Sequence, residues 1–441
     1  MGIDASDRAR RVTTCRVCNG TDWQNVVSFG PVPLANGFLE PAESYDDEPY
    51  YPLGVISCRH CRLMSVTHVV DPEVLYRSYP YVTSTSETIS RHMRYVAETC
   101  RRRFALDGEA LVVEFGSNTG AQLTAFQDIG LRTVGVDPAS NLAEVANRRG
   151  VETVAEFFSA RTAELVAERF GRARLLLGRH VFAHIDDLPG VLAGARRLLT
   201  PDGVLVIEVP YAVDLVRKVA FDTVYHEHLS YFLVSTLDTL FARHGLRLFD
   251  VERTPVHGGS ILVFAGPAEG PWPTRPSVGE LVRAERRGGL RHDAAYQAFA
   301  ADVARVRTEL PALVRRLRAG GSRIAGYGAS AKGNTILNVC GIGADVLEFC
   351  SDTTTLKQDK VLPGTHVPVQ SPERARLDPP DYYLLLAWNY AEEIVAKERD
   401  FLRGGGRFVL PIPEPMVVGE DLAPQPARPG LVPVPRVLDQ A

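Results

Sequence analysis

The chain has 441 residues, of which 45% are hydrophobic and 23% charged, and its 53 acidic and 49 basic side chains give a net charge of −4. This length predicts two or three domains, and the composition is that of an ordinary soluble globular protein with a sizeable core. The balanced charge without a long basic block does not favour general nucleic-acid binding, and no membrane-spanning run or signal peptide is found. We therefore expect a cytoplasmic protein without a membrane partner, as a monomer or weak homodimer.

Two Cys-x-x-Cys pairs, Cys15 with Cys18 and Cys58 with Cys61, lie near the start of the chain. Each pair can form a tight turn, and four thiolates complete a tetrahedral zinc shell that leaves no open position for catalysis. A redox dithiol or unrelated free thiols are the alternatives. The pattern predicts a structural Zn2+ module over residues 1–75, with a small inserted element around residues 33–53.

An aromatic segment that includes Tyr79 and Pro80 follows this module. Its hydroxyl groups could cap a pocket, or the segment could be a packed linker. Apolar residues at helical spacing then predict a docking helix from residue 89 to about 106.

The stretch from Leu111 to Gly120 predicts a buried strand and a glycine turn that opens a helix. Asp137 ends a second predicted strand, where an acidic side chain can hold ribose hydroxyls. The glycine spacing is looser than the dinucleotide fingerprint, and the whole unit resembles class I methyltransferases that use S-adenosylmethionine (SAM). The resemblance implies cofactor contacts from Glu114, Gly116, Asn118, Gly120 and Asp137, with Phe157 and Phe158 near the adenine.

An alternating β/α pattern continues through the domain predicted for residues 76–272. Strands are expected at residues 111–115, 132–136, 174–178, 203–208 and near 260–265, with helices at 141–149 and 187–199. This order predicts a mostly parallel, doubly wound sheet with its ligand at the carboxyl ends of the strands. His184 follows the third of these strands and is therefore expected at the ligand edge.

The densest group of reactive side chains is Tyr225-His226-Glu227-His228. A histidine is a suitable general base near neutral pH, a carboxylate can fix its tautomer, and a tyrosine can stabilise an oxyanion. This set suits proton abstraction beside a ketone. The alternatives are that His226 and His228 bind a metal, or that the segment is a hydrogen-bonded polar loop.

A third domain is predicted for residues 273–415, followed by a proline-rich tail at 416–441. Its expected elements are a long helix over residues 296–317 broken near Pro311, a strand–turn–helix unit over 322–334, and strands at 346–350, 382–387 and 407–410. Backbone amides at the turn, with Ser330 and Lys332, suit a diphosphate. The residues alone also leave open an NAD(H) site there.

Taken together, the two cysteine pairs, residues 114–120, residues 225–228 and the sequence Pro255-Val-His-Gly-Gly resemble the zinc-containing, SAM-dependent deoxysugar C-methyltransferases of antibiotic biosynthesis. The resemblance covers nearly the whole chain. It implies an α/β protein with an N-terminal four-cysteine zinc module, a central Rossmann-like methyltransferase domain and a smaller Rossmann-like C-terminal domain.

The same resemblance implies methylation of the carbon next to the 4-keto group of a dTDP-linked 4-keto-deoxysugar, with C-3 expected. His228 would remove the proton, and Glu227 would orient or polarise His228. Tyr225, Tyr79 and His184 would line the site. The C-terminal domain would help to bind the nucleotide-sugar, and the residues expected there are Tyr327, Ser330, Lys332 and Asn334. The alternatives are C-5 methylation, N- or O-methylation, an NAD-dependent sugar-nucleotide oxidoreductase, and a zinc-finger binding module.

Overall fold

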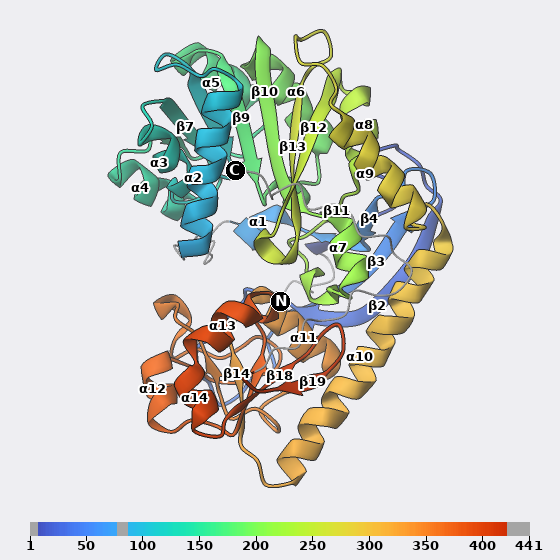
Figure 1. Cartoon of the computed structure of the whole chain (residues 1–441), viewed down its shortest axis with the longest axis vertical. Helices are drawn as coiled ribbons and strands as arrows, with labels where there is room; N and C mark the ends of the chain where they lie inside the picture. The colour runs from blue at the N-terminus through green and yellow to red at the C-terminus, as the bar shows by residue number, and fades with distance from the viewer. Residues whose placement is uncertain (1–7, 77–86, 421–441) are drawn as a thin grey trace.

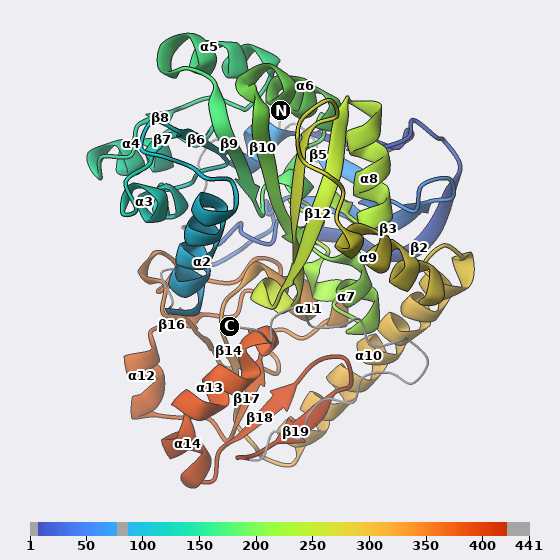
Figure 2. The same cartoon turned by 45° about the horizontal axis from the view of Figure 1, so that its top comes forward.

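The structure is a computed structural model that describes residues 8–76 and 87–420. Within these ranges the strands form sheets of two, four, six and seven strands. The N-terminal module lies between two α/β domains, and the long helix α10 (Asp293–Ala319) runs along the side of the molecule from one domain to the other (Figures 1 and 2). The predicted fold class is confirmed.

The N-terminal module is a small β structure. Strand β1 (Ala9–Arg11) pairs with β5 (His68–Val70), and β2 (Trp23–Pro33) forms an antiparallel hairpin with β3 (Tyr50–Cys58). The hairpin and its loop supply the inserted element expected between the cysteine pairs. β4 (Met64–Val66) extends this sheet, whose fourth strand is β11 (Ser230–Tyr231) from the next domain. Helix α1 (Pro72–Tyr76) ends the module.

The central domain contains the seven-stranded sheet in the order β12-β13-β10-β9-β6-β7-β8. All neighbouring pairs are parallel except those made by β13. The chain reverses its direction of winding between β6 and β9, which places the ligand crevice there. The strands are β6 (Leu111–Phe115), β7 (Arg132–Val136), β8 (Thr153–Val154), β9 (Ala173–Arg179), β10 (Leu199–Pro210), β12 (Leu246–Thr254) and β13 (Ser260–Pro267).

Helices cover both faces of this sheet because its strand residues are apolar on both sides. Val112 and Leu177 belong to the core under α2 and α3, whereas Val113 and Leu176 belong to the core under α5 and α6. Such two-sided burial is expected of a parallel sheet. The helices are α2 (Glu87–Arg103), α3 (Ala121–Gln127), α4 (Ser140–Arg148), α5 (Ala160–Phe170), α6 (Leu188–Leu198), α7 (Ala212–Arg217), α8 (Val234–Arg243) and α9 (Pro276–Arg287).

The C-terminal domain repeats the same winding in a smaller sheet of order β16-β15-β14-β17-β18-β19, in which only β19 is antiparallel to its neighbour. The strands are β14 (Ile324–Tyr327), β15 (Cys350–Ser351), β16 (Val369–Gln370), β17 (Tyr382–Leu385), β18 (Arg407–Leu410) and β19 (Met416–Val418). The helices are α11 (Ala331–Cys340), α12 (Pro372–Leu377), α13 (Ala391–Lys397) and α14 (Arg399–Arg403).

Three expectations for this domain are wrong in detail. The strand predicted from Val346 begins only at Cys350, because the amides of Val346 and Leu347 bond the Gly343 carbonyl in a turn. The helix predicted to break near Pro311 continues through it, since the buried apolar face of α10 packs on both sides of the proline. Strand β19 lies inside the segment expected to be a tail and extends the sheet.

No helix in the described part of the chain combines the length and apolar composition that crossing a membrane requires.

Candidate active site

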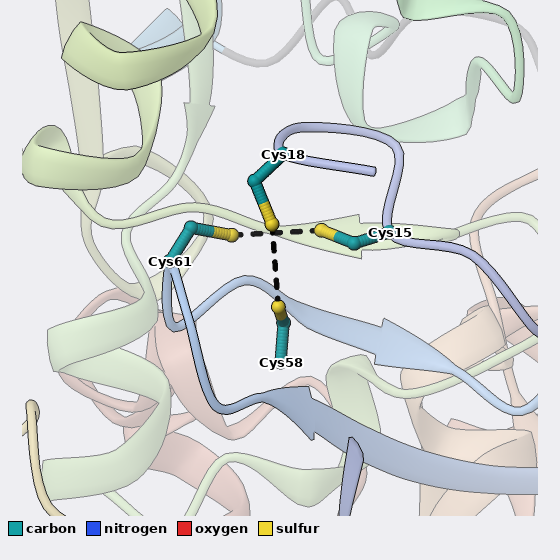
Figure 3. A group of neighbouring side chains, drawn as sticks. All are labelled: Cys15, Cys18, Cys58 and Cys61. Carbon is teal, nitrogen blue, oxygen red and sulfur yellow. Dashed lines mark hydrogen bonds between the residues drawn. The ribbon is translucent and has the colours of Figure 1, made fainter. Parts of the chain in front are cut away.

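The four cysteines of the two Cys-x-x-Cys pairs converge, as predicted (Figure 3). Their sulfur atoms all lie within 4.8 Å of one another. Each pair lies on a turn that ends at a residue with a left-handed backbone, Asn19 in the first turn and Arg62 in the second. The backbone amide of this residue donates a hydrogen bond to the carbonyl of the first cysteine of the pair. Zinc–sulfur bonds of about 2.3 Å in a tetrahedron place sulfur atoms about 3.8 Å apart, so the cluster fits a zinc ion with a closed shell.

The glycine turn after β6 forms one wall of a cavity at the switch point of the central sheet. Gly116 has φ +64°, and a side chain there would collide with Val181. Asp137 accepts hydrogen bonds from the backbone amides of Asn118, at 2.7 Å, and Ala139, at 2.9 Å. The turn is thus fixed onto the end of β7, with Gly116, Ser117 and Asn118 in the lining of the cavity.

Glu114 lies at the floor of this cavity. Its side chain is buried, one carboxylate oxygen has no hydrogen-bond partner, and burial raises its pKa to about 8. An unpaired buried carboxylate oxygen beside a glycine turn fits a cationic ligand with amino or hydroxyl groups. SAM meets this description, and the residues present therefore fit it.

The cavity brings together five of the predicted residues and adds others that the sequence reasoning missed. The predicted ones are Glu114, Gly116, Asn118, Asp137 and His184, and the unpredicted ones include Tyr76, Gln122, Arg179, His180 and His257. Gly120 does not line it but begins α3 with a left-handed backbone. Phe157 and Phe158 also lie outside the cavity lining. Phe158 packs on Phe115 with ring centroids 5.0 Å apart, and the Phe157 side chain is exposed. Tyr79 lies outside the described residues.

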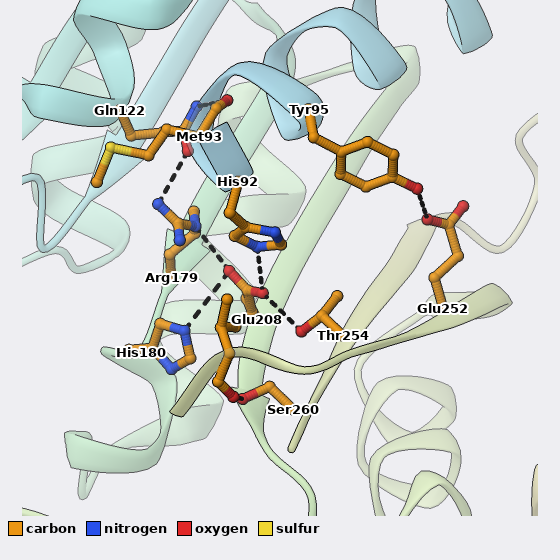
Figure 4. Close-up of polar contacts among 11 residues, drawn as sticks. His92, Met93, Tyr95, Gln122, Arg179, His180, Glu208, Glu252, Thr254 and Ser260 are labelled. Atoms are coloured by element: carbon orange, nitrogen blue, oxygen red, sulfur yellow. Dashed lines mark hydrogen bonds and ion pairs between the residues drawn. The ribbon is translucent and has the colours of Figure 1, made fainter. Parts of the chain in front are cut away.

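A buried ion-pair network supports the far wall of the cavity (Figure 4). Glu208 at the end of β10 is fully buried and accepts hydrogen bonds from Arg179 at 2.7 Å and Thr254 at 3.1 Å, with the His92 ring 2.6 Å away. Burial alone would raise the pKa of Glu208, but Arg179 and the nearby imidazoles hold it well below its ordinary value. The sequence signal for this network is a charged residue inside the apolar strand sequence Leu-Val-Ile-Glu-Val, because a buried charge needs a partner.

His180 and His257 stand next to each other at this wall, with ring centroids 4.3 Å apart. Both have left-handed backbones, with φ of +53° and +54°. Burial lowers the pKa of each imidazole, so both are neutral near pH 7. Strained, half-buried and neutral histidines on a cavity wall are typical of a functional site.

His228 lies beside His184, with ring centroids 5.0 Å apart. Its Nδ1 is 2.7 Å from the Thr223 carbonyl oxygen, and its Nε2 is 2.7 Å from the Tyr225 hydroxyl. A carbonyl can only accept, so Nδ1 carries the proton and Nε2 accepts from Tyr225. Burial lowers the pKa of His228 well below its usual value and that of His184 to about 3.

Glu227 is held by a different part of the molecule. Its Oε1 accepts a 2.6 Å hydrogen bond from the Asn36 amide of the zinc module. The His228 ring itself is hydrogen-bonded to Tyr225 and Thr223, and the orienting role expected of Glu227 stays a prediction. His226 points to the module, where its Nε2 lies 3.2 Å from the Tyr51 carbonyl oxygen.

The four residues expected to bind the nucleotide-sugar all make contacts within the protein. The Tyr327 hydroxyl donates to Glu398 at 2.8 Å, and the Ser330 hydroxyl caps α11 by accepting from the Gly333 amide at 3.0 Å. Lys332 Nζ donates to the His257 carbonyl at 3.0 Å. Asn334 Nδ2 donates to the Ala35 carbonyl at 2.6 Å. Lys332 therefore links the C-terminal glycine turn directly to the cavity wall.

Three protein-family models match the chain in succession. A zinc binding domain matches residues 15–76, a methyltransferase domain matches 89–251, and a C-methyltransferase C-terminal domain matches 255–413. The C-methyltransferase NovU of Streptomyces niveus is 50% identical over 415 residues, which are 94% of this chain and 99% of that protein.

Solved structures of methyltransferases resemble about two fifths of the chain. The 1,6-didemethyltoxoflavin-N1-methyltransferase of Burkholderia thailandensis is 23% identical, with 41% of this chain and 80% of that chain covered at a TM-score of 0.32. The magnesium protoporphyrin IX methyltransferase of Synechocystis is 11% identical, with 40% and 82% covered at a TM-score of 0.32.

Proposed function

Since this chain belongs to the family of SAM-dependent C-methyltransferases that carry an N-terminal zinc module, we propose that it methylates a ring carbon next to the 4-keto group of a dTDP-linked deoxysugar. The carbon is C-3 in this proposal. The observation that carries it is the arrangement of His228, whose Nε2 lone pair faces the Tyr225 hydroxyl beside the cofactor cavity.

His228 is suited to be the base. Its Nδ1 proton is held by the Thr223 carbonyl, so Nε2 keeps a lone pair. Because burial lowers the pKa of His228, the imidazole stays neutral well below pH 7. A weak base of this kind needs an acidic substrate proton, and a proton beside a ketone is acidic enough when the enolate oxygen is stabilised.

The proposed reaction begins when Nε2 of His228 takes the proton from C-3 and the C–H electron pair forms the enolate. The Tyr225 hydroxyl, displaced from Nε2, then donates to the enolate oxygen. With SAM bound in the cavity, the enolate carbon would take its methyl group, the methyl–sulfur bond would break to leave S-adenosylhomocysteine, and the ketone would re-form while the proton remains on His228. SAM supplies a methyl group that is already electrophilic because it is bonded to a sulfonium.

The neutral state of the cavity histidines supports this assignment. Burial lowers the pKa of His180, His184 and His257, so all three are uncharged at neutral pH. A cluster of imidazolium ions would repel a sulfonium, whereas neutral rings can hydrogen-bond to sugar hydroxyls.

The C-terminal domain supports a nucleotide-linked substrate. Lys332 joins its glycine turn to His257 of the cavity, so a diphosphate at this turn would place an attached sugar near the cavity. The match of residues 255–413 to a C-methyltransferase domain covers this turn and favours the sugar nucleotide over NAD(H).

The test is incubation of a panel of dTDP-4-keto-deoxysugars with methyl-labelled SAM, followed by mass spectrometry and NMR. Wild type is expected to label C-3, and His228→Asn to lose at least about a hundredfold in turnover. In D2O with S-adenosylhomocysteine, wild type should exchange the C-3 proton and His228→Asn should not. Label at C-5 would correct the position, and label on nitrogen or oxygen, or full activity of His228→Asn, would overturn the proposal.

A further inference from the structure

The segment that carries His228 is built into the sheet of the zinc module. Ser230 and Tyr231 form β11, which pairs antiparallel with Ser65 and Met64 of β4. The carbonyl of Leu229 accepts from the Val66 amide at 3.2 Å and from the Ser65 hydroxyl at 3.1 Å. The backbone directly after His228 is therefore fixed by the module.

Side chains before His228 are held by the same module. His226 lies against the Tyr51 carbonyl of β3, and Glu227, only 5% exposed, accepts the Asn36 amide at 2.6 Å. His228 itself turns away from the module, towards Tyr225 and His184. The segment is thus held on both sides of His228, whose ring lies next to His184 of the cavity lining.

The loop that carries Asn36 is itself anchored on the C-terminal domain. The Ala35 carbonyl accepts from Asn334, and Leu39 exchanges two backbone hydrogen bonds with Val361, at 2.9 and 3.2 Å. At the exposed side of the loop, Lys360 pairs with Glu40 at 3.1 Å. Because neighbouring residues are held on a different domain, Asn36 is preorganised to donate to Glu227.

We propose that Asn36 is a positioning residue of the methyl transfer: it holds Glu227 and thereby fixes the segment that places His228 next to His184 of the cavity lining. This rests on the proposed function, which assigns His228 as the base. The loss of a hydrogen bond from a buried carboxylate costs free energy that a small shift of the segment can reduce, and Glu227 directly precedes His228 along the chain. The zinc module is then part of the catalytic apparatus, although its cysteines contact no reacting atom.

The test compares Asn36→Ala and Asn36→Asp with Lys360→Ala, which breaks an ion pair of the same loop without touching Glu227. Asn36→Ala is expected to lower kcat roughly tenfold, the loss of one hydrogen bond to a charged group, with the SAM Kd and Tm near wild type. Lys360→Ala is expected to keep wild-type kcat, because a surface ion pair contributes little.

The pH profile separates positioning from general loop damage. Asn36→Asp places a second carboxylate against Glu227, so one of the two pKa values rises. At low pH the shared proton restores a hydrogen bond, and at high pH the two charges repel. The ratio of its kcat to that of wild type is therefore expected to fall as pH rises, while the ratio for Asn36→Ala stays flat.

Two results would overturn the positioning role: unchanged kcat in Asn36→Ala, or an equal loss of kcat in all three loop variants together with a lowered Tm. His228→Asn, measured alongside, tells the two proposals apart. If His228→Asn loses turnover and Asn36→Ala does not, the positioning role alone is wrong. If His228→Asn keeps wild-type turnover, the proposed function is wrong, whatever Asn36→Ala does.

Discussion

The glycine turns after β6 and β14 have the same pattern of backbone hydrogen bonds but different surroundings. After β6, Asp137 accepts the amides of Asn118 and Ala139, and after β14, Asp352 accepts those of Ala329 and Thr354, each at 2.7–2.9 Å. In both turns a strand-end aspartate bonds one amide of the turn and the amide two residues beyond itself. The winding of the sheets around them is also the same.

The turns differ in what surrounds them. The first opens on a cavity with the unpaired Glu114 oxygen at its floor. At the second, Lys357 reaches the Ala329 carbonyl at 2.8 Å and Lys332 reaches across to His257. The carboxyl groups beside the first turn are Glu114 and Asp137, and the amino groups beside the second are Lys332 and Lys357. We propose that the first turn takes a cation and the second a phosphate. A glycine turn therefore predicts a fold, and the side chains around it decide the ligand.

We expect the largest change in ligand binding when each of the two aspartates is replaced by asparagine. Asp137→Asn should weaken SAM binding by roughly tenfold to a hundredfold, because an amide NH2 then faces one of the two backbone donors. Asp352→Asn should leave SAM affinity nearly unchanged and raise the KM for the nucleotide-sugar. Calorimetric SAM titrations and steady-state kinetics check both predictions. An equal loss of SAM affinity in the two variants would contradict the assignment of SAM to the first turn alone.

Lys332 tests whether the second turn takes an anion. Lys332→Met keeps the length of the side chain but removes its charge, so the KM for a dTDP-sugar should rise about tenfold while the SAM Kd stays the same. Lys397→Met, at the end of α13, is the control for loss of one positive charge. An unchanged KM in Lys332→Met would show that the lysine serves only to hold His257.

Glu114 should make SAM binding release a proton. Its pKa of about 8 means that it is mostly protonated at pH 7, and a bound cation favours the carboxylate. Titration calorimetry at pH 7 in buffers of different ionisation enthalpy is expected to show release of up to about one proton, lost in Glu114→Gln. A buffer-independent enthalpy in wild type would exclude this linkage.

The last expected effect is on acid stability. His184 has a pKa of about 3 when folded, below the usual value near 6.5, so between these pH values the unfolded chain binds a proton that the folded chain does not. The contribution of His184 to the free energy of unfolding is therefore complete above pH 6.5. As the pH falls below 6.5, this contribution decreases by about 1.4 kcal/mol per pH unit. Tm measured from pH 7 to 5 should fall less steeply in His184→Asn than in wild type.

Local patterns predicted the parts of the fold that depend on nearby residues. Strands β6 and β7 have the bounds predicted from the sequence, at residues 111–115 and 132–136, and the four cysteines meet because each pair forms its own turn. A local pattern could single out Glu208 but could not name its partner His92, nor pair Asn36 with Glu227, because these partners lie 116 and 191 residues apart. Pro311 shows the same limit: a local helix-breaking signal was outweighed by packing along the whole of α10.

The sheet shared by the zinc module and the central domain constrains the order in which the chain can fold. Ser65 and its partner Leu229 are 164 residues apart, so a ribosome that adds about 5–20 residues per second reaches the second roughly 10–30 s after the first. During this interval the edge of β4 has been made but its neighbour has not. The module must therefore wait with an open strand edge until β11 is synthesised, and residues 87–272 expressed alone would lack the surface on which the His228 segment is built.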